Sequence, residues 1–188
     1  MLDRRDFVRR ILIERGDLLV VPGLGCATYD VAAAGDHPLN FYLWGAMGGT
    51  AMIALGLALA QPGRRVVAIP GDGDMLMGIG SLATIGVRQP KKLVVVILDN
   101  AHYGETGMQP SHTSAGIDFA AVALGCRFKT ARTVSRIEEA AEVRRLIHSG
   151  EGPILINAKI DAEDVPRVLP LRDGHAIKQR FIEALNPA

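Results

Sequence analysis

Two kinds of apolar segment alternate along this chain. Short continuous apolar runs have the length of buried strands, and longer segments with apolar residues three or four positions apart have the spacing of amphipathic helices. The pattern predicts strands over residues 18–21, 40–43, 66–69, 93–98, 127–130 and 153–160. It predicts helices over residues 7–14, 50–61, 74–87, 117–124, 135–148 and 175–185, the fifth with Ser135 as N-cap and Glu138 completing a capping box.

This alternation of strands and helices predicts the fold class. Strands that alternate with helices form a parallel sheet with helices on both faces, a three-layer α/β fold. The sequence has no internal repeat and no flexible linker, and 188 residues are enough for one substantial core. We therefore expect a single domain over residues 1–188.

Composition and charge change this picture little. A hydrophobic content of 48% and a charged content of 22% are typical of globular proteins, and a net charge of +1 gives no reason to expect nucleic acid or an anionic membrane as a partner. Cys26 and Cys126 are far apart without metal-type spacing, which indicates free thiols in a reducing cytoplasm. We expect no signal peptide. Residues 41–60 lack charge over the length of a membrane span, but glycines interrupt them, so a buried core helix is the better interpretation.

Polar side chains follow two of the predicted strands. The strand at 66–69 leads into Gly71-Asp72-Gly73-Asp74, and the strand at 93–98 leads into Asp99-Asn100. The carboxyl ends of strands line the ligand crevice of an open parallel sheet, and carboxylate and amide oxygens are the ligands that Mg²⁺ prefers. Glycines let the backbone approach an anion, and a helix that starts there offers free N–H groups. The pattern predicts a site for magnesium and a diphosphate-like group.

Other interpretations of these residues fit the chain less well. Asp72 could simply cap a helix, and its pairing with Asn100 at a second strand end favours the metal role. Residues 23–28 follow a strand, but Thr28 replaces the third glycine of a dinucleotide fingerprint. An aspartyl-phosphate phosphatase would need a hydroxyl residue soon after Asp74, and none follows. The chain has no P-loop motif.

The order Gly71-Asp72-Gly73, then Asn100, resembles the cofactor signature of thiamine-diphosphate enzymes. The resemblance implies that Asp72, the side-chain oxygen of Asn100 and the backbone carbonyl of His102 bind Mg²⁺. It further implies that the cofactor thiamine diphosphate lies against the residues of these two segments: Gly71, Asp72, Gly73, Asp74, Met75, Asn100, His102 and Tyr103.

A second segment carries the same resemblance. Trp44-Gly45-Ala46-Met47-Gly48 is similar to the turn of this family that holds the cofactor's two rings. The resemblance implies that the Gly45 carbonyl accepts a hydrogen bond from the 4'-amino group and that Met47 wedges between the rings. Ala46 and Gly48 complete the turn.

The sequence departs from the family pattern at two positions. Asp74 stands where the family has a small neutral residue, and we expect it to turn away from the diphosphate as the N-cap of its helix. Thr106 stands where some decarboxylases carry a glutamate. His112 is a further candidate for contact with substrate, although a solvated loop histidine fits its position equally well. Three residues near the C-terminus are expected to be surface charges: Arg167, Arg172 and His175.

In the family the activating glutamate belongs to a separate pyrimidine-binding domain, and 188 residues have the length of the diphosphate-binding domain alone. The resemblance therefore implies a partner subunit in a hetero-oligomer, with thiamine diphosphate bound between the two chains. Residues 80–85, 103–110 and 166–174 resemble the small split decarboxylases of acidic 2-oxo acids, such as 3-sulfopyruvate and phosphonopyruvate decarboxylases. The implied reaction turns the 2-oxo acid into an aldehyde and carbon dioxide.

Two other functions stay open at this point. The chain could be half of an acetolactate-synthase-like carboligase, which differs only in how the reactive carbanion is quenched. It could also be a non-catalytic, cofactor-binding regulatory subunit.

Overall fold

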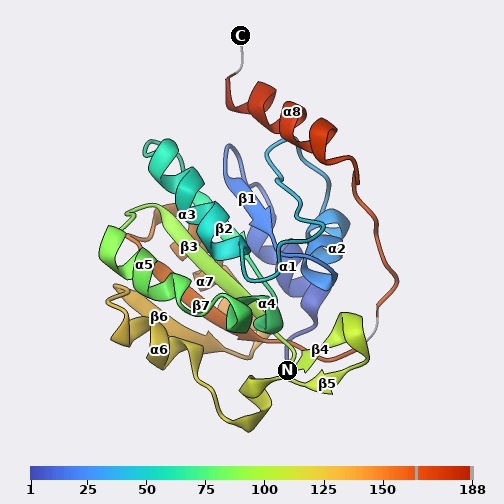
Figure 1. Cartoon of the computed structure of the whole chain (residues 1–188), viewed down its shortest axis with the longest axis vertical. Coiled ribbons are helices and arrows are strands. Elements are labelled where there is room, and N and C mark those ends of the chain that lie inside the picture. Colours follow the sequence, from blue (N-terminus) through green and yellow to red (C-terminus); the bar gives the residue numbers. More distant parts are fainter. Residues whose placement is uncertain (164, 187–188) are drawn as a thin grey trace.

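A five-stranded parallel sheet forms the centre of the protein (Figure 1). The computed structural model describes residues 1–163 and 165–186. The strand order is β1-β2-β3-β7-β6, and every neighbouring pair is parallel. The strands are β1 (Leu19–Pro22), β2 (Val66–Ile69), β3 (Leu93–Asp99), β6 (Thr130–Val134) and β7 (Ile154–Lys159).

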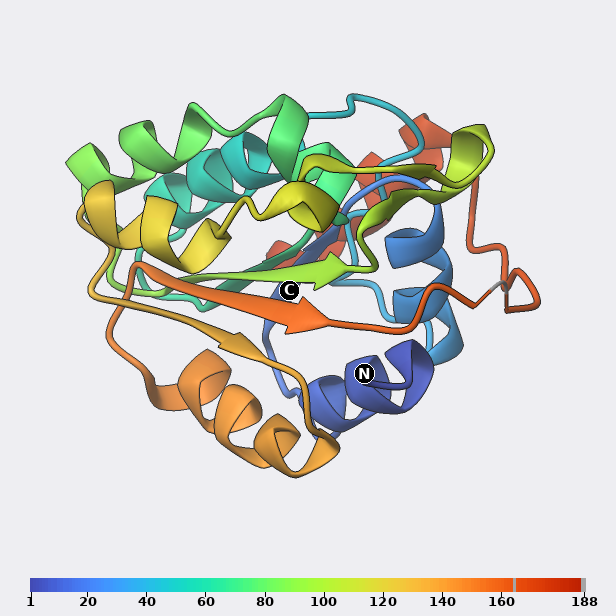
Figure 2. The same ribbon diagram turned by 90° about the horizontal axis from the view of Figure 1, so that it is seen from below.

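Helices cover both faces of this sheet, which confirms the expected three-layer α/β fold. One layer contains α3, α5 and α6, and the opposite layer contains α1 and α7, as the edge-on view in Figure 2 shows. The helices are α1 (Arg4–Leu12), α2 (Cys26–Ala33), α3 (Thr50–Ala60), α4 (Asp72–Met77), α5 (Ser81–Arg88), α6 (Phe119–Gly125), α7 (Ala140–Ser149) and α8 (Gly174–Leu185). A short antiparallel pair, β4 (His102–Tyr103) and β5 (Gln109–Pro110), follows β3.

Strand β3 shows why the sequence folds in this way. All seven of its residues are buried, and successive side chains point to opposite faces of the sheet. Val94, Val96 and Leu98 join the core beneath α1 and α7, whereas Leu93, Val95 and Ile97 join the core beneath α3 and α5. A strand that is buried on both faces needs a continuous apolar run, as the sequence has here.

The helix predicted over 74–87 is two helices. Helix α4 begins at Asp72 and ends at Met77, and α5 begins at Ser81. The break falls at Gly78, where the chain passes so close to the Gly48 backbone that a Cβ would lie 2.1 Å from the Gly48 carbonyl oxygen. The apolar period continues through this break, so periodicity alone could not reveal it.

Several other boundaries differ from the sequence predictions. Residues 40–43 form only an isolated bridge between Val20 and Asn40, and the strand expected at 127–130 runs over 130–134 instead. Glu139, not Glu138, accepts hydrogen bonds from the N–H groups of Ser135 and Arg136. Helix α2 was not predicted, because its residues carry little helical period.

Residues 41–60 do not form a long helix. Only α3, with 11 residues, is helical in this stretch. Across the described residues, every helix is too short or too polar to traverse a lipid bilayer.

The contact between α5 and the segment after α6 gives a prediction about stability. A Cβ at Gly86 would lie 1.6 Å from the backbone carbonyl oxygen of Cys126. We expect Gly86→Ala to lower the free energy of unfolding by about 3 kcal/mol, because backbone must move to make room. Urea unfolding measures this. Gly56→Ala is the matched control: it lies in α3 with open space at the Cβ position, and should add about 0.5–1 kcal/mol. Equal effects of the two changes would contradict the close packing.

Candidate cofactor site

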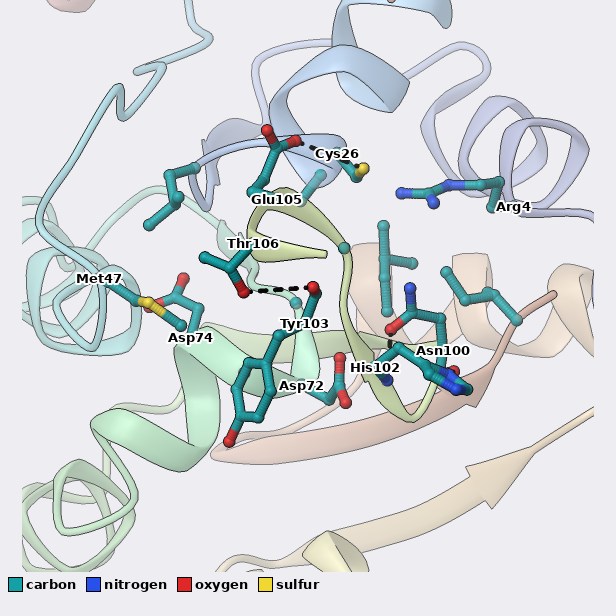
Figure 3. A pocket seen from close by; sticks show the side chains of 17 residues that line it. Arg4, Cys26, Met47, Asp72, Asp74, Asn100, His102, Tyr103, Glu105 and Thr106 are labelled. Atoms are coloured by element: carbon teal, nitrogen blue, oxygen red, sulfur yellow. Dashed lines mark hydrogen bonds between the residues drawn. The ribbon is translucent and has the colours of Figure 1, made fainter. Parts of the chain in front are cut away.

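The carboxyl ends of β2 and β3 lie side by side. The parallel pairing of these strands extends beyond β2 as a bridge between Gly71 and Leu98. This bridge brings the residues that follow, Asp72 and Asn100, to one cavity of about 140 Å³ (Figure 3). The structure therefore brings together the two side chains that the sequence analysis paired.

Asp72 is buried, with 2% of its surface exposed, and two hydroxyl groups hold it. Its Oδ2 accepts a hydrogen bond from Ser111 Oγ at 2.5 Å, and Thr113 Oγ1 lies 3.3 Å from the same oxygen. Within the described chain, no side chain donates to the other oxygen, Oδ1. Burial raises the pKa of Asp72, and the nearby Asp99 carboxylate adds to this effect, whereas the Ser111 hydrogen bond opposes it. A cation in the cavity would relieve this cost of a buried charge.

The loop after Asn100 turns back on itself. Ala101 has a left-handed φ of 60°, and the Asn100 side-chain oxygen accepts a hydrogen bond from the His102 N–H at 3.0 Å. The His102 ring Nδ1 lies 2.8 Å from the Asn100 carbonyl oxygen, so the imidazole is engaged within its own loop. The backbone carbonyl of His102 thus stays the predicted third metal ligand.

A buried polar network behind Asp72 was not anticipated. Asp99 accepts hydrogen bonds from Thr113 Oγ1 at 2.8 Å and Asn157 Nδ2 at 3.0 Å, and it pairs with Lys159 Nζ at 2.5 Å. Thr113 Oγ1 lies within hydrogen-bond distance of both Asp72 and Asp99, and its one proton goes to the nearer Asp99. The only sequence signal was an aspartate at the end of a buried strand, and its partners come from β7 and from a loop distant in sequence.

The Gly45–Gly48 turn lies beside the cavity and is anchored by Asp74. Met47 lines the cavity, whereas Gly45 and Ala46 are exposed at the outside of the turn. Asp74 Oδ1 accepts a hydrogen bond from the Gly48 N–H at 2.6 Å, and its Oδ2 accepts one from Thr50 Oγ1.

The expectation that Asp74 caps its own helix was wrong. Gly71 is the N-cap of α4, and Asp74 holds the N-terminus of α3 instead. Gly23 allows this contact, since a Cβ there would lie 2.4 Å from Asp74 Oδ2. Burial raises the pKa of Asp74, and the hydrogen bonds from Thr50 and Gly48 oppose the shift. Asp74 thus joins the two segments that the family resemblance identified separately.

The remaining candidates, Met75, Tyr103, Thr106 and His112, lie in different surroundings. Met75 does not line the cavity: its side chain is buried in the core next to α3 and α5, which corrects its assignment as a cofactor contact. Tyr103 lies over Gly73, where a Cβ would meet the ring at 2.7 Å. Thr106 lines the cavity at its exposed edge, and His112 borders a second cavity of about 490 Å³, where its Nδ1 lies 3.3 Å from the Tyr103 hydroxyl.

Two charges near the C-terminus do more than face solvent. Arg167 pairs with Glu105, a cavity residue, at 3.5 Å and stacks on Tyr29. Arg172 stacks on Trp44, the residue before the turn. Both side chains are exposed, as expected for surface charges, and they reach these partners because the chain after β7 returns across α2.

The donor set of the cavity fits magnesium and a diphosphate. A carboxylate with one free oxygen and an amide oxygen are hard ligands, and Mg²⁺ in such sites takes its other ligands from water and phosphate. Gly71 has open space at its Cβ position, so nothing shields the backbone there from a bulky anion.

The comparisons with known proteins agree with this geometry. Residues 23–158 match the family described as thiamine pyrophosphate enzyme, C-terminal TPP binding domain. The chain belongs to this family. The matched range contains both segments of the family resemblance and all the residues that line the cavity except Arg4 and Ile160.

Proteins with assigned activities align with most of this chain. It is 33% identical to a sulfopyruvate decarboxylase subunit beta from Methanocaldococcus jannaschii, over 97% of this chain and 96% of that protein. It is 35% identical to a phosphonopyruvate decarboxylase from Streptomyces viridochromogenes, over 82% of this chain and 40% of that longer protein. A thiamine diphosphate-dependent 4-hydroxybenzoylformate decarboxylase from Rhodococcus jostii RHA1 shares the fold, with a TM-score of 0.71 and 21% identity over 86% of this chain and 33% of that one.

The buried charge of Asp72 predicts a gain in stability when it is removed. The folded chain keeps a proton on Asp72 at pH values where the unfolded chain has lost it, because burial raises the pKa in the fold. The free energy of unfolding therefore falls as the pH rises from about 4 to the folded pKa. Without metal, Asp72→Asn should be more stable than the parent at neutral pH by on the order of 1 kcal/mol. This difference should vanish at acid pH, and urea unfolding across pH checks it; a constant difference would contradict the argument.

The anchoring by Asp74 predicts a joint loss of stability and affinity. Asp74→Ala leaves the Gly48 N–H and the Thr50 hydroxyl without their acceptor, which should cost about 1–3 kcal/mol in unfolding free energy. Calorimetry should also show weaker binding of thiamine diphosphate with Mg²⁺, since the Met47 turn loosens. Asp118→Ala is the control: it removes the N-cap of α6, costs about 1 kcal/mol, and should leave this affinity unchanged. Unchanged affinity in Asp74→Ala would refute the anchoring role.

Proposed function

We propose that this chain is the diphosphate- and magnesium-binding subunit of a hetero-oligomeric thiamine diphosphate-dependent decarboxylase. Its substrate would be a small acidic 2-oxo acid such as 3-sulfopyruvate, and its products an aldehyde and carbon dioxide. The observation that carries the proposal is the meeting of Asp72 and Asn100 on one cavity. The end-to-end similarity to a sulfopyruvate decarboxylase subunit beta supports the choice of substrate class.

In this proposal each group has a defined task. Asp72, the side-chain oxygen of Asn100 and the backbone carbonyl of His102 hold Mg²⁺, which binds the diphosphate. Met47 and the Gly45 carbonyl would orient the rings, and Gly71 and Gly73 would let the backbone approach the diphosphate, with Tyr103 lying over Gly73. When bound, thiamine diphosphate supplies the electron sink for decarboxylation, and the protein positions it.

The proposal includes a partner subunit with a pyrimidine-binding domain. The glutamate that activates the cofactor would come from that chain. Glu105 lines the cavity here, but its carboxylate is paired with Arg167, which makes it a poor candidate for this task. Residues 1–188 would act as one diphosphate-binding domain. We place the assembly in the cytoplasm, and the two cysteines, both free, support a reducing compartment.

Reconstitution tests the proposal directly. The chain alone, with thiamine diphosphate, Mg²⁺ and 3-sulfopyruvate, should release no carbon dioxide. Addition of the pyrimidine-domain subunit, sought in the neighbouring reading frame, should start the reaction, and Asp72→Ala in the assembled complex should reduce the rate by at least about a hundredfold. Full turnover by the isolated chain would refute the split, and a complex that tolerates Asp72→Ala would indicate a regulatory subunit.

The product and the preferred substrate distinguish the related activities. An aldehyde is expected, and acetolactate from pyruvate would indicate a carboligase. Phosphonopyruvate is the second candidate substrate, because the chain is 35% identical to a phosphonopyruvate decarboxylase. A higher kcat/KM for phosphonopyruvate than for 3-sulfopyruvate would make phosphonopyruvate the preferred substrate.

A further inference from the structure

Arg4 is a buried cation at the cavity that the proposed function does not use. It lies at the start of α1, only 4% of its surface is exposed, and it lines the same cavity as Asp72 and Asn100. Figure 3 shows its guanidinium directed into the cavity between Cys26 and Asn100. Of the 17 residues that line this cavity, Arg4 is the only arginine or lysine.

The charge of Arg4 is not cancelled by its ion pair. Asp30 accepts from Arg4 Nε at 2.7 Å and also from Arg5 Nε at 3.3 Å, so one carboxylate serves two guanidinium groups. The cluster of three therefore carries a net charge of +1. Burial disfavours the charged form of Arg4, but the Asp30 carboxylate outweighs this effect and raises its pKa. The bond to Asp30 uses Nε, and the Cys26 thiol at the cavity wall donates to Glu105 Oε1 at 3.6 Å.

The first turn of α2 adds N–H groups at the same place. Its N-cap, Gly25, has a left-handed φ of 67° and offers no side-chain cap to the first N–H groups. A Cβ at Gly25 would lie 2.7 Å from Glu105, so no other residue fits without a shift. Cys26 and Ala27, the first two residues of this eight-residue helix, line the cavity. An anion there would meet both the positive end of the helix and a buried guanidinium.

We propose that Arg4, with the first turn of α2, binds the terminal phosphate of thiamine diphosphate. This rests on the proposed function and extends it: Asp72 and Asn100 hold the metal, and Arg4 adds a second, metal-independent contact to the diphosphate. A guanidinium suits this task, because its planar fork matches two phosphate oxygens and keeps its charge when buried. Its own carboxylate partner fixes its orientation, so it costs little to arrange it when the cofactor binds.

The test compares two ligands that differ by the terminal phosphate. Calorimetry with saturating Mg²⁺ measures the Kd of the full chain for thiamine diphosphate, and competition measures it for thiamine monophosphate. Arg4→Gln should weaken thiamine diphosphate binding about tenfold to a hundredfold and leave thiamine monophosphate nearly unchanged. Arg4→Lys keeps the charge without the fork and should show an intermediate loss. Thermal unfolding of each variant verifies that it is folded.

Arg5→Gln is the matched control. Arg5 shares Asp30 but directs its other nitrogen to the Pro166 carbonyl oxygen, and it does not line the cavity. It should leave both affinities unchanged. Equal losses in the Arg4→Gln and Arg5→Gln proteins, or a loss for both ligands alike, would overturn the assignment. If Arg4→Gln does not fold, the Arg4→Lys and Arg5→Gln comparison decides in the same way.

A failure of the proposed function would give different results from a failure of the Arg4 assignment. In that case the unaltered chain would not bind thiamine diphosphate in a Mg²⁺-dependent way, or Asp72→Asn would bind it as well as the parent. Failure of the Arg4 assignment alone would leave Mg²⁺-dependent binding intact and sensitive to Asp72.

Discussion

The parallel pairing of β2 with β3 is the constraint on which the site depends. The bridge between Gly71 and Leu98 carries this pairing past the end of β2, and the chain leaves both strands at the same edge of the sheet. Asp72 and Asn100 are therefore neighbours although a whole helical segment separates them in sequence. Both strands are buried on both faces, so a slip in register would expose apolar side chains. The hydrophobic core therefore keeps the Asp72 and Asn100 side chains at a fixed separation.

This arrangement buries three carboxylates at the edge of the sheet, which is unfavourable for their charged forms. Asp72, Asp74 and Asp99 are all nearly inaccessible, and each is held by a different kind of partner. Asp99 has the Lys159 ammonium group, Asp74 has the Gly48 N–H and the Thr50 hydroxyl, and Asp72 has the Ser111 hydroxyl and backbone N–H groups. Asp72, unlike Asp74, has its pKa raised further by a nearby carboxylate, that of Asp99, and it is the one at the proposed metal position. A buried negative charge of this kind is expected where a bound cation, which the chain does not contain when it folds without cofactor, supplies the compensating positive charge.

The polar residues at the strand ends could be predicted from the sequence, but the hydrogen bonds that join them to the rest of the chain could not. The Gly71–Asp74 segment and Asn100 were found because strand ends with glycine and hard oxygen ligands form a local, readable pattern. The bond from Asp74 to Thr50, the link from Asp72 through Thr113 to Asp99, and the approach of Arg4 could not be found. Each joins residues at least 14 positions apart, and each depends on how distant segments pack together. The local rules also failed at Asp74, which accepts hydrogen bonds at the start of α3, and at Glu138, where Glu139 is the acceptor instead.

By itself, the sequence determined the alternation of strands and helices, the three-layer fold and the family resemblance, because buried apolar runs and glycine-containing strand ends are properties of neighbouring residues. The tertiary structure decided where the helix after Asp72 breaks, which partners hold each buried carboxylate and which side chains line the cavity. These depend on close approaches between distant segments, such as Gly78 against Gly48 and Gly23 against Asp74. Such approaches are set by the packing of the whole chain, and no short window of sequence contains them.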